Sequence, residues 1–245
     1  MRILEGERIS KNFEGLTALA NVDFHISRGE ILGLIGPNGA GKTTLFNLIS
    51  GSLVPTSGTI KFKGENITGL KPHRICRKGI ARTFQLVKLF GNMTVLENIL
   101  LGGLFGPSTA SPRSHTKKAC LELLEFVGLS EMKENLAKDL TIINQKRLEV
   151  ARALATKPEL LLLDEFMAGL NHTEVALAIE LIKKIRNLGV TIIMIEHVMK
   201  VIMDISHRIL VLHYGEKIAE GKPEDIYKNE KVVEAYLGGE TSAHG

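Results

Sequence analysis

The chain reads Gly36-Pro37-Asn38-Gly39-Ala40-Gly41-Lys42-Thr43-Thr44 between a short apolar run, Ile31–Ile35, and a stretch with helical periodicity at 44–50. The apolar run predicts a buried strand, so the glycine-rich segment joins a strand to the first turn of a helix. Glycines there let backbone N–H groups converge on an anion, and the helix directs its positive end toward the same charge. Lys42 adds a mobile cation, and Thr43 adds a hydroxyl that can ligate Mg²⁺. We therefore predict a nucleoside triphosphate site on an α/β fold.

Length and composition indicate a globular protein. The 245 residues are 44% hydrophobic and 24% charged, and no apolar run approaches the roughly 18 residues that a membrane span needs. The first eight residues lack the basic region and apolar core of a secretory signal, so we expect a cytoplasmic protein. The net charge of +4 is scattered, aromatic residues make up 5% and Trp is missing, which argues against nucleic acid as a partner. Cys76 and Cys120 lie far apart, and we expect two reduced thiols.

The first part of the chain predicts strands followed by helices. Alternating apolar residues at 3–9 and 22–26 indicate antiparallel strands joined by turns, and another strand pattern follows at 79–84. From 94 to 156 the periodicity is helical, and a flexible loop rich in Ser and Pro is expected at 108–114. This order predicts an antiparallel β region that precedes a helical region.

The second half of the chain alternates strands and helices. Strand-like runs at 160–163, 190–195 and 208–212 are separated by helical patterns, an order typical of a parallel sheet with helices on both faces. We therefore predict a single α/β domain over 1–245, with a mainly parallel sheet core, an N-terminal antiparallel β-subdomain and an inserted α-helical subdomain. The expected boundaries place the core with the β-subdomain at 1–86 and 157–245, and the helical subdomain at 87–156.

Polar residues follow several of the predicted strands. Four leucines precede Asp164 and Glu165, so the strand delivers two carboxylates at its C-terminal end, where α/β sheets place their sites. We expect Asp164 to hold Mg²⁺ and Glu165 to polarise the water that attacks the γ-phosphate. His197 follows the strand at 190–195, and Gln85 ends the strand at 79–84. Taken alone, a histidine at a helix start is more often a capping or solvated residue than a γ-phosphate contact.

Together these motifs resemble the ATPases of ATP-binding cassette (ABC) transporters over essentially the whole chain. The resemblance implies the fold of a phosphate-loop NTPase with ATP and Mg²⁺ as ligands. It also implies the following roles: adenine stacking by Phe13, phosphate binding by residues 36–44, catalysis by Glu165, His197 and Gln85, metal binding by Thr43, Gln85 and Asp164, and a dimer contact by the loop at 169–171.

Finer strings at 81–85, 93–98, 168–171, 195–200 and 234–238 are similar to the ATPase subunits of branched-chain amino acid importers. This similarity implies an energy-coupling subunit that is peripheral on the cytoplasmic face of the cell membrane. The implied partners are transmembrane permease subunits, which would contact the exposed segment 85–92, and a second ATPase subunit. A substrate-binding protein would be an indirect partner. The transported molecule itself is not expected to touch this subunit.

The chain departs from the family at the signature that binds the ATP of the opposite subunit. A Leu-Ser-Gly-Gly-Gln-like string is replaced by Leu140-Thr141-Ile142-Ile143-Asn144, before a helix expected at 145–156. Ile143 stands where glycine permits close approach or positive φ, so it should cost on the order of 1 kcal/mol there or enforce another loop shape. A homodimer would carry this defect twice, so we expect an asymmetric heterodimer. Asn171-His172 also lacks the usual Asn-Pro, which leaves Asn171 as the expected helix N-cap.

Three other functions compete with importer ATPase. An exporter ATPase for lipid or lipopolysaccharide would share every catalytic residue, and only the permease separates it from an importer. A cassette protein acting on DNA or ribosomes would carry two cassettes in one chain or a long coiled coil, and neither feature fits 245 residues. A nucleotide-binding regulator that does not hydrolyse ATP would not need Glu165 and His197.

Overall fold

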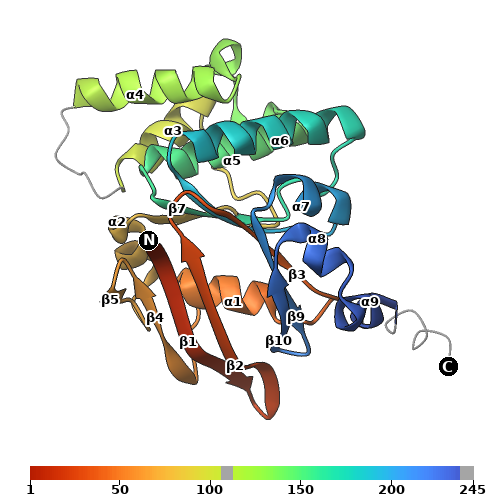
Figure 1. Ribbon diagram of the computed structural model, residues 1–245. Helices are drawn as coiled ribbons and strands as arrows, with labels where there is room; N and C mark the ends of the chain where they lie inside the picture. The colour runs from red at the N-terminus through yellow and green to blue at the C-terminus, as the bar shows by residue number, and fades with distance from the viewer. Residues whose placement is uncertain (106–112, 238–245) are drawn as a thin grey trace. The chain divides into compact units, whose positions relative to one another are not determined.

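A computed structural model describes residues 1–105 and 113–237 of the chain, and Figure 1 shows their helices and strands. The chain divides into two compact units, Met1–Pro72 with Thr191–Gly245, and His73–Val190. Each unit is described by itself below. The loop expected at 108–114 lies outside the described residues except for 113 and 114, which belong to helix α4 (Arg113–Phe126).

The first unit begins with an antiparallel sheet in the order β2-β1-β4-β5. Its strands are β1 (Arg2–Phe13), β2 (Leu16–Ser27), β4 (Ser57–Phe62) and β5 (Glu65–Asn66). Strands β1 and β2 form a hairpin, because Glu14 and Gly15 take the positive φ values of 38° and 98° that a tight turn requires. Leu4 lies opposite both Ile26 and Phe62, and these three side chains are buried. The sheet therefore has an apolar face.

The same unit contains parallel strands followed by a hairpin. Strand β3 (Ile31–Ile35) pairs in parallel with β8 (Thr191–Ile195) and β9 (Arg208–His213), and β10 (Glu216–Gly221) turns back antiparallel to β9. Every residue of β3 and β8 is buried, as expected for parallel strands covered on both faces. The helices of this unit are α1 (Lys42–Ile49), α7 (Met199–Ile205), α8 (Pro223–Tyr227) and α9 (Glu230–Leu237).

The second unit combines a parallel strand pair with helices. Strand β6 (Ile80–Arg82) pairs with β7 (Leu160–Asp164), and the helices are α2 (Pro72–Lys78), α3 (Val95–Gly103), α4, α5 (Ile142–Ala155) and α6 (His172–Asn187). Helices α3 and α5 pack closely, since a Cβ on Gly102 would lie 2.5 Å from the Arg152 carbonyl oxygen. Capping boxes begin α3 at Thr94 and α6 at Asn171, so the predicted Asn171 N-cap is confirmed.

The predicted fold class is confirmed, with an antiparallel N-terminal sheet, parallel core strands and a helical region. Two elements differ in length from the prediction. Helix α5 begins at Ile142 rather than at 145, and β6 is shorter than the strand expected at 79–84.

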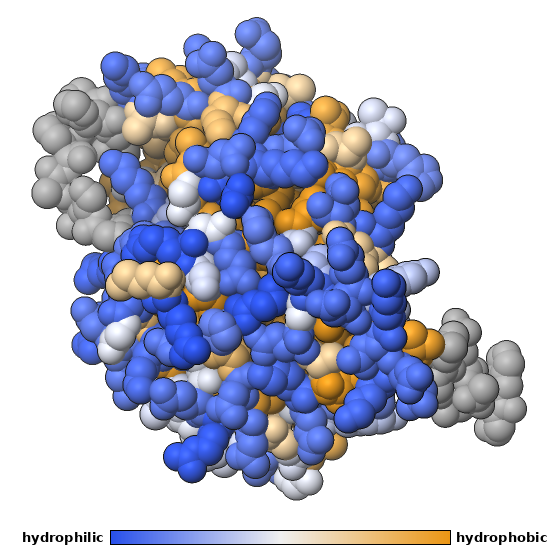
Figure 2. Space-filling model, viewed as in Figure 1, coloured by the Kyte–Doolittle hydropathy of each residue, from blue (hydrophilic) through white to orange (hydrophobic). Residues whose placement is uncertain are grey.

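The face drawn in Figure 2 is mostly hydrophilic. Across 1–105 and 113–237, the structure contains no helix with the length and apolar character of a membrane span.

Candidate functional site

The phosphate-binding loop predicted at 36–44 runs from the end of β3 into α1. Gly36, Gly39 and Gly41 have φ values of 150°, 79° and 101°, which side-chain-bearing residues rarely adopt. Space is also limiting, because a Cβ on Gly36 would lie 2.1 Å from the Leu212 carbonyl oxygen and one on Gly41 would lie 2.6 Å from that of Ala18. Helix α1 has no side-chain N-cap and no acidic residue in its first turn. The loop thus has the backbone shape and the helix end of an anion site.

Lys42 lies across this loop. Its side chain is 6% exposed, and its Nζ atom donates hydrogen bonds to the carbonyl oxygens of Gly36, at 2.7 Å, and Pro37, at 2.9 Å. The ammonium group is therefore held at the residues whose backbone shapes the anion site. Thr43 is exposed and Thr44 is half-buried at the start of α1, so the Thr43 hydroxyl is accessible to a ligand.

Two further predicted site residues lie in the same unit as the loop. Strand register pairs Leu34 with Ile195, so the phosphate loop and His197 leave the sheet from adjacent parallel strands at the same edge. The His197 side chain is exposed there. Phe13 ends β1 with 40% of its surface exposed, and the Lys11 Nζ atom lies 4.9 Å from the centre of its ring.

In the second unit, β7 ends at Asp164, which is 3% exposed. The Asp164 Oδ2 atom accepts a hydrogen bond of 2.7 Å from the Arg82 guanidinium, and its backbone N–H donates one of 3.3 Å to the Thr83 hydroxyl. The guanidinium balances a carboxylate that would be costly to bury alone. Sequence reasoning assigned no role to Arg82, which ends the neighbouring strand β6.

Glu165 follows directly and contacts Gln85. The Gln85 Nε2 atom donates a 2.7 Å hydrogen bond to Glu165 Oε2. Lys146 Nζ donates to the Glu165 carbonyl oxygen at 3.2 Å. Glu165 has a φ of 51°, a left-handed conformation that non-glycine residues adopt at a cost of order 1–3 kcal/mol. The Lys146 hydrogen bond supports the backbone at this position.

Glu149 was missed by sequence reasoning and anchors the segment that carries Gln85. It is 3% exposed on α5, and its Oε1 atom accepts hydrogen bonds from the backbone N–H groups of Phe84 and Lys88, both at 3.3 Å. Burial raises the pKa of this carboxyl, while the two N–H contacts lower it. Because these contacts flank Gln85 on both sides, they limit where its amide can reach.

The degenerate signature forms the start of α5. Thr141 is the N-cap with a φ of −62°, Ile142 is 59% exposed, and Ile143 is 9% exposed inside the first turn. Within the described chain, Ile143 is not among the non-glycine residues with positive φ. Asn144 donates a hydrogen bond to the Met132 sulfur, and Gln145 donates one to the Leu140 carbonyl oxygen. The isoleucine is thus accommodated by helical backbone and burial, without the left-handed strain considered from the sequence.

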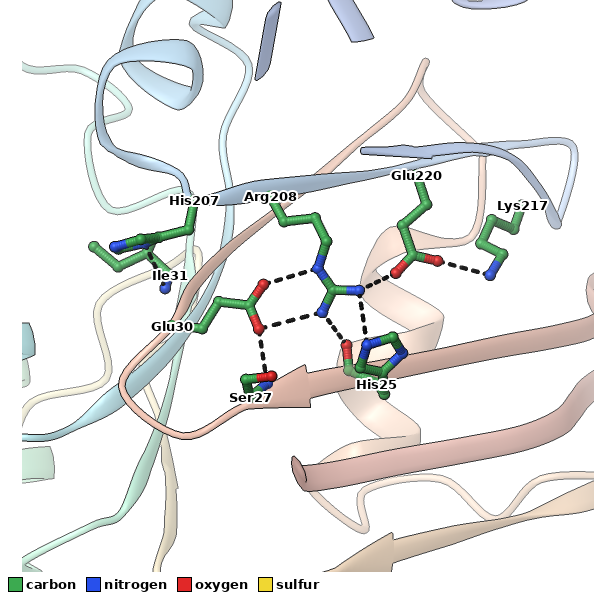
Figure 3. Close-up of polar contacts among 8 residues, drawn as sticks. All are labelled: His25, Ser27, Glu30, Ile31, His207, Arg208, Lys217 and Glu220. Carbon is green, nitrogen blue, oxygen red and sulfur yellow. Dashed lines mark hydrogen bonds and ion pairs between the residues drawn. The ribbon is translucent and has the colours of Figure 1, made fainter. Parts of the chain in front are cut away.

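Near the entry to β3, one arginine joins three strands and a turn of the first unit (Figure 3). Arg208 on β9 binds Glu30 with two nitrogens, at 2.8 and 3.2 Å, and donates to the His25 carbonyl oxygen on β2 at 2.6 Å. It also pairs with Glu220 on β10, which Lys217 contacts at 2.7 Å. Glu30 accepts the Ser27 N–H at 2.7 Å. This cluster ties β2 of the antiparallel sheet to β9, β10 and the turn that leads into β3, the strand that ends at the phosphate loop.

Comparison with known families gives two matches. A family model described as "ABC transporter" matches residues 19–168. A second model, described as "Branched-chain amino acid ATP-binding cassette transporter", matches residues 216–241. The first match contains the phosphate loop and both carboxylates, and the second contains β10, α8 and α9.

Individual proteins extend these matches. The high-affinity branched-chain amino acid transport ATP-binding protein LivG of Escherichia coli (strain K12) is 43% identical, covering 96% of this chain and 98% of that protein. A crystal structure of an ATP-binding cassette of an ABC transporter in its ADP conformation has a TM-score of 0.88 and 31% identity, covering 97% of this chain and 99% of that chain. A dimeric cassette bound to ADP and Pi has a TM-score of 0.81 and 27% identity, covering 90% and 99%.

Proposed function

Because this chain belongs to the ABC transporter family, and is therefore a nucleotide-binding ATPase subunit, we propose that it couples ATP hydrolysis to the import of branched-chain amino acids or related small molecules. The phosphate loop is the observation that carries the proposal. It combines left-handed glycines, a helix start without a side-chain cap, and Lys42 held at the loop carbonyls. Residues 36–44 bind the phosphates, and Phe13 stacks on the adenine.

The residues that follow the strands fit a magnesium-dependent hydrolysis. Mg²⁺ prefers hard oxygen ligands and is usually bound by one or two carboxylates together with substrate phosphates. Thr43 supplies an accessible hydroxyl, Asp164 a carboxylate and Gln85 an amide oxygen, so the donor set fits the ion. When bound, the ion neutralises charge that develops on the phosphates.

We assign the proton chemistry to Glu165. A base must lie within hydrogen-bond reach of the water whose proton it takes. Glu165 accepts a 2.7 Å hydrogen bond from the Gln85 amide, and its carbonyl oxygen accepts one from Lys146, so its carboxylate and its backbone each have a partner. His197, exposed at the strand edge beside the phosphate loop, contacts the γ-phosphate and the attacking water. In this assignment Gln85 connects the water and the metal to Glu165 through its hydrogen bond with that carboxylate.

The branched-chain substrate class rests on the C-terminal match and on LivG. The second family model covers residues 216–241, a segment separate from the phosphate loop and the carboxylates. An exporter ATPase would share the catalytic residues, so this C-terminal segment is what favours import.

The partners in this proposal are transmembrane permease subunits, and the chain lies on the cytoplasmic face of the membrane. Exposed apolar side chains offer them a surface in the second unit, at Leu86, Phe90, Leu104 and Phe105.

In this proposal a second, different ATPase subunit completes the ATP-hydrolysing dimer. In the dimeric relative the cassette is paired, whereas here the signature carries Ile143 in place of a glycine. Its side chain is buried in α5, and the neighbouring Asn144 amide is occupied by the Met132 sulfur. A signature in this state binds the partner's ATP weakly. A partner with an intact signature would close over the ATP held by Lys42, and one of the two composite sites would dominate hydrolysis.

Two substitutions test the ATPase assignment in the assembled transporter. Glu165→Gln should abolish ATP turnover and leave the Kd of Mg-ATP unchanged, with Glu180→Gln on the exposed face of α6 as the control. Lys42→Ala should abolish Mg-ATP binding, with Lys183→Ala as the control. Full turnover in Glu165→Gln would contradict the assigned base, and retained affinity in Lys42→Ala would contradict the phosphate loop.

Light scattering of Glu165→Gln with Mg-ATP tests the heterodimer. We expect a monomer alone and a dimer when a partner ATPase subunit with an intact signature is added. A dimer formed by this chain alone would show that residues 140–144 still close over ATP, and the asymmetric model would be wrong.

A further inference from the structure

An arginine that has no role in the proposed reaction binds the buried carboxylate of Asp164. Arg82 ends β6, and strand register places it beside Leu162 of β7, two positions before Asp164. Its Nη2 atom donates a 2.7 Å hydrogen bond to Asp164 Oδ2. The side chains of Arg82 and Asp164 are 8% and 3% exposed. The distance and the burial together describe a close ion pair that is largely withdrawn from water.

The guanidinium of Arg82 is held in place from two sides. Its Cζ atom lies 5.2 Å from the centre of the Phe84 ring, a distance at which a cation is attracted to an aromatic face. The other end of the side chain is anchored, because Arg82 belongs to the parallel pairing of β6 with β7. A guanidinium is planar and directs its N–H groups along fixed lines. It therefore sets the orientation of a bound carboxylate more closely than an ammonium group would.

The backbone of Asp164 is held separately from its side chain. Its N–H donates a 3.3 Å hydrogen bond to the hydroxyl of Thr83, a residue that is 1% exposed. The Thr83 N–H in turn donates to the Leu162 carbonyl oxygen at 2.9 Å. With the backbone supported in this way, what remains to Asp164 is rotation of the side chain, which the hydrogen bond from Arg82 limits.

Orientation matters for a carboxylate that binds a metal ion. Mg²⁺ demands a near-ideal octahedral arrangement of its ligands, so it tolerates a poorly directed ligand badly. Groups that hydrogen-bond to a ligating side chain orient it and thereby raise its affinity for the metal. The Arg82 hydrogen bond uses Oδ2 of Asp164, and it thereby also sets the direction of the second carboxylate oxygen.

We propose that Arg82 is a positioning residue for magnesium, which acts through Asp164 by holding its carboxylate in one orientation. This inference rests on the proposed function, in which Asp164 ligates the ion. The competing explanation is a purely structural pair, in which Arg82 only neutralises a buried acid. The two roles differ in what loss of the guanidinium changes. A structural pair contributes to stability alone, whereas a positioning residue contributes to the part of nucleotide affinity that depends on Mg²⁺.

Arg82→Met in the full chain removes the guanidinium and keeps an apolar stem. The matched control is Arg74→Met on α2, where the side chain is exposed. Calorimetric titration with a non-hydrolysable ATP analogue gives one Kd in Mg²⁺ and another in EDTA. The ratio of the EDTA value to the Mg²⁺ value, here called the magnesium gain, isolates the contribution of the metal ion.

The expected change follows from the effect of groups that orient metal ligands. Their loss commonly costs 10–100-fold in metal affinity or activity, so we expect Arg82→Met to lower the magnesium gain about tenfold. Its Kd in EDTA should stay unchanged, because Arg82 acts on the metal ligand and not on the phosphate loop. Arg74→Met should match the unsubstituted chain in both conditions.

A conservative variant covers the case in which Arg82→Met does not fold, since loss of one partner of a buried ion pair is strongly destabilising. Arg82→Lys retains the positive charge and loses the planar guanidinium, so its magnesium gain should lie between those of Arg82→Met and the unsubstituted chain. If Arg82→Met does not fold, a lowered gain in Arg82→Lys supports the positioning role and an unchanged gain overturns it.

The outcomes separate this inference from the function on which it rests. A lowered magnesium gain in Arg82→Met with an unchanged Kd in EDTA supports the positioning role. An unchanged or raised gain overturns it, whether or not the melting temperature falls, and leaves the ATPase assignment intact. Failure of the unsubstituted chain to bind the analogue, or to bind it more tightly in Mg²⁺ than in EDTA, would refute the proposed function itself and the inference with it.

Discussion

Replacing Arg208 with Met should destabilise the first unit more than removal of an exposed ion pair does. The guanidinium neutralises Glu30 and Glu220, whose side chains are 11% and 17% exposed, and its own side chain is 19% exposed (Figure 3). Met keeps the apolar stem that packs along β9 and removes only the charged donors. The substitution leaves Glu220 paired with Lys217 and deprives Glu30 of its guanidinium partner.

The magnitude follows from the burial of the charges and from the hydrogen bonds that the guanidinium makes. Breaking a buried ion pair by removal of one partner costs about 3–5 kcal/mol, because an uncompensated charge stays out of water. The carboxylates of Glu30 and Glu220 retain some access to solvent, which reduces that penalty. The His25 carbonyl oxygen would also be deprived of a 2.6 Å hydrogen bond. We therefore expect a loss of about 3 kcal/mol in the free energy of unfolding of the first unit.

The control is Lys61→Met, which removes a 3.0 Å pair with Glu7 between side chains that are 39% and 55% exposed. Exposed pairs contribute about 0–1 kcal/mol, so this variant should stay close to the unsubstituted protein. The chain has no Trp, so urea unfolding is followed by far-ultraviolet circular dichroism, with separate transitions fitted separately if the two units unfold independently. A decrease in stability in Arg208→Met no larger than that in Lys61→Met would refute the argument from burial.

Three further measurements test other parts of the structure. Burial, followed by the charges of Arg208 and Arg2, lowers the pKa of His25 in the folded protein. The unfolded chain therefore binds more protons as the pH falls below about 6.5, and the free energy of unfolding decreases there. His25→Gln should make the stability in urea less dependent on pH between about 7.5 and 5.5. Glu149→Ala, which frees both sides of the Gln85 segment, should lower ATP turnover of the assembled transporter while the Kd of Mg-ATP stays unchanged. Ile143→Gly should cost about 3 kcal/mol or more of stability and allow Glu165→Gln to dimerise alone in light scattering.

The parts of the site that local sequence determines could be predicted. The phosphate loop needs a strand, glycines with positive φ and the start of a helix within a few residues, and each of these features can be recognised in the sequence. Asp164 and Glu165 were likewise predicted from four leucines and the end of a strand. The Asn171 N-cap follows from one residue and its capping partner. The boundaries expected for the helical subdomain, 87–156, stay a prediction.

Contacts between distant residues could not be predicted in this way. Glu149 reaches Phe84 across 65 positions of the sequence, and Arg208 reaches Glu30 across 178. The sequence pattern of a helix does not distinguish a buried glutamate from a solvated one. Only the packing of α5 therefore reveals the role of Glu149. The strain expected at Ile143 assumed a loop with glycine geometry, whereas α5 begins one residue before Ile143 and gives it helical φ.

The difference in backbone also explains why the signature and the phosphate loop respond differently to substitution. In the phosphate loop a Cβ at Gly36 would lie 2.1 Å from a backbone oxygen, which cannot move without displacing β9. At Ile143 the larger residue instead fills buried space at the start of a helix. Under the proposed role of the signature, the cost would fall on the surface offered to a partner's ATP and not on folding. At position 36, stability and the proposed nucleotide recognition both favour glycine. At position 143, stability favours isoleucine, whereas the proposed recognition of a partner's ATP favours glycine. If the proposed heterodimer forms, a subunit paired with a different partner could retain the isoleucine, because under that proposal its own nucleotide is bound by its own loop.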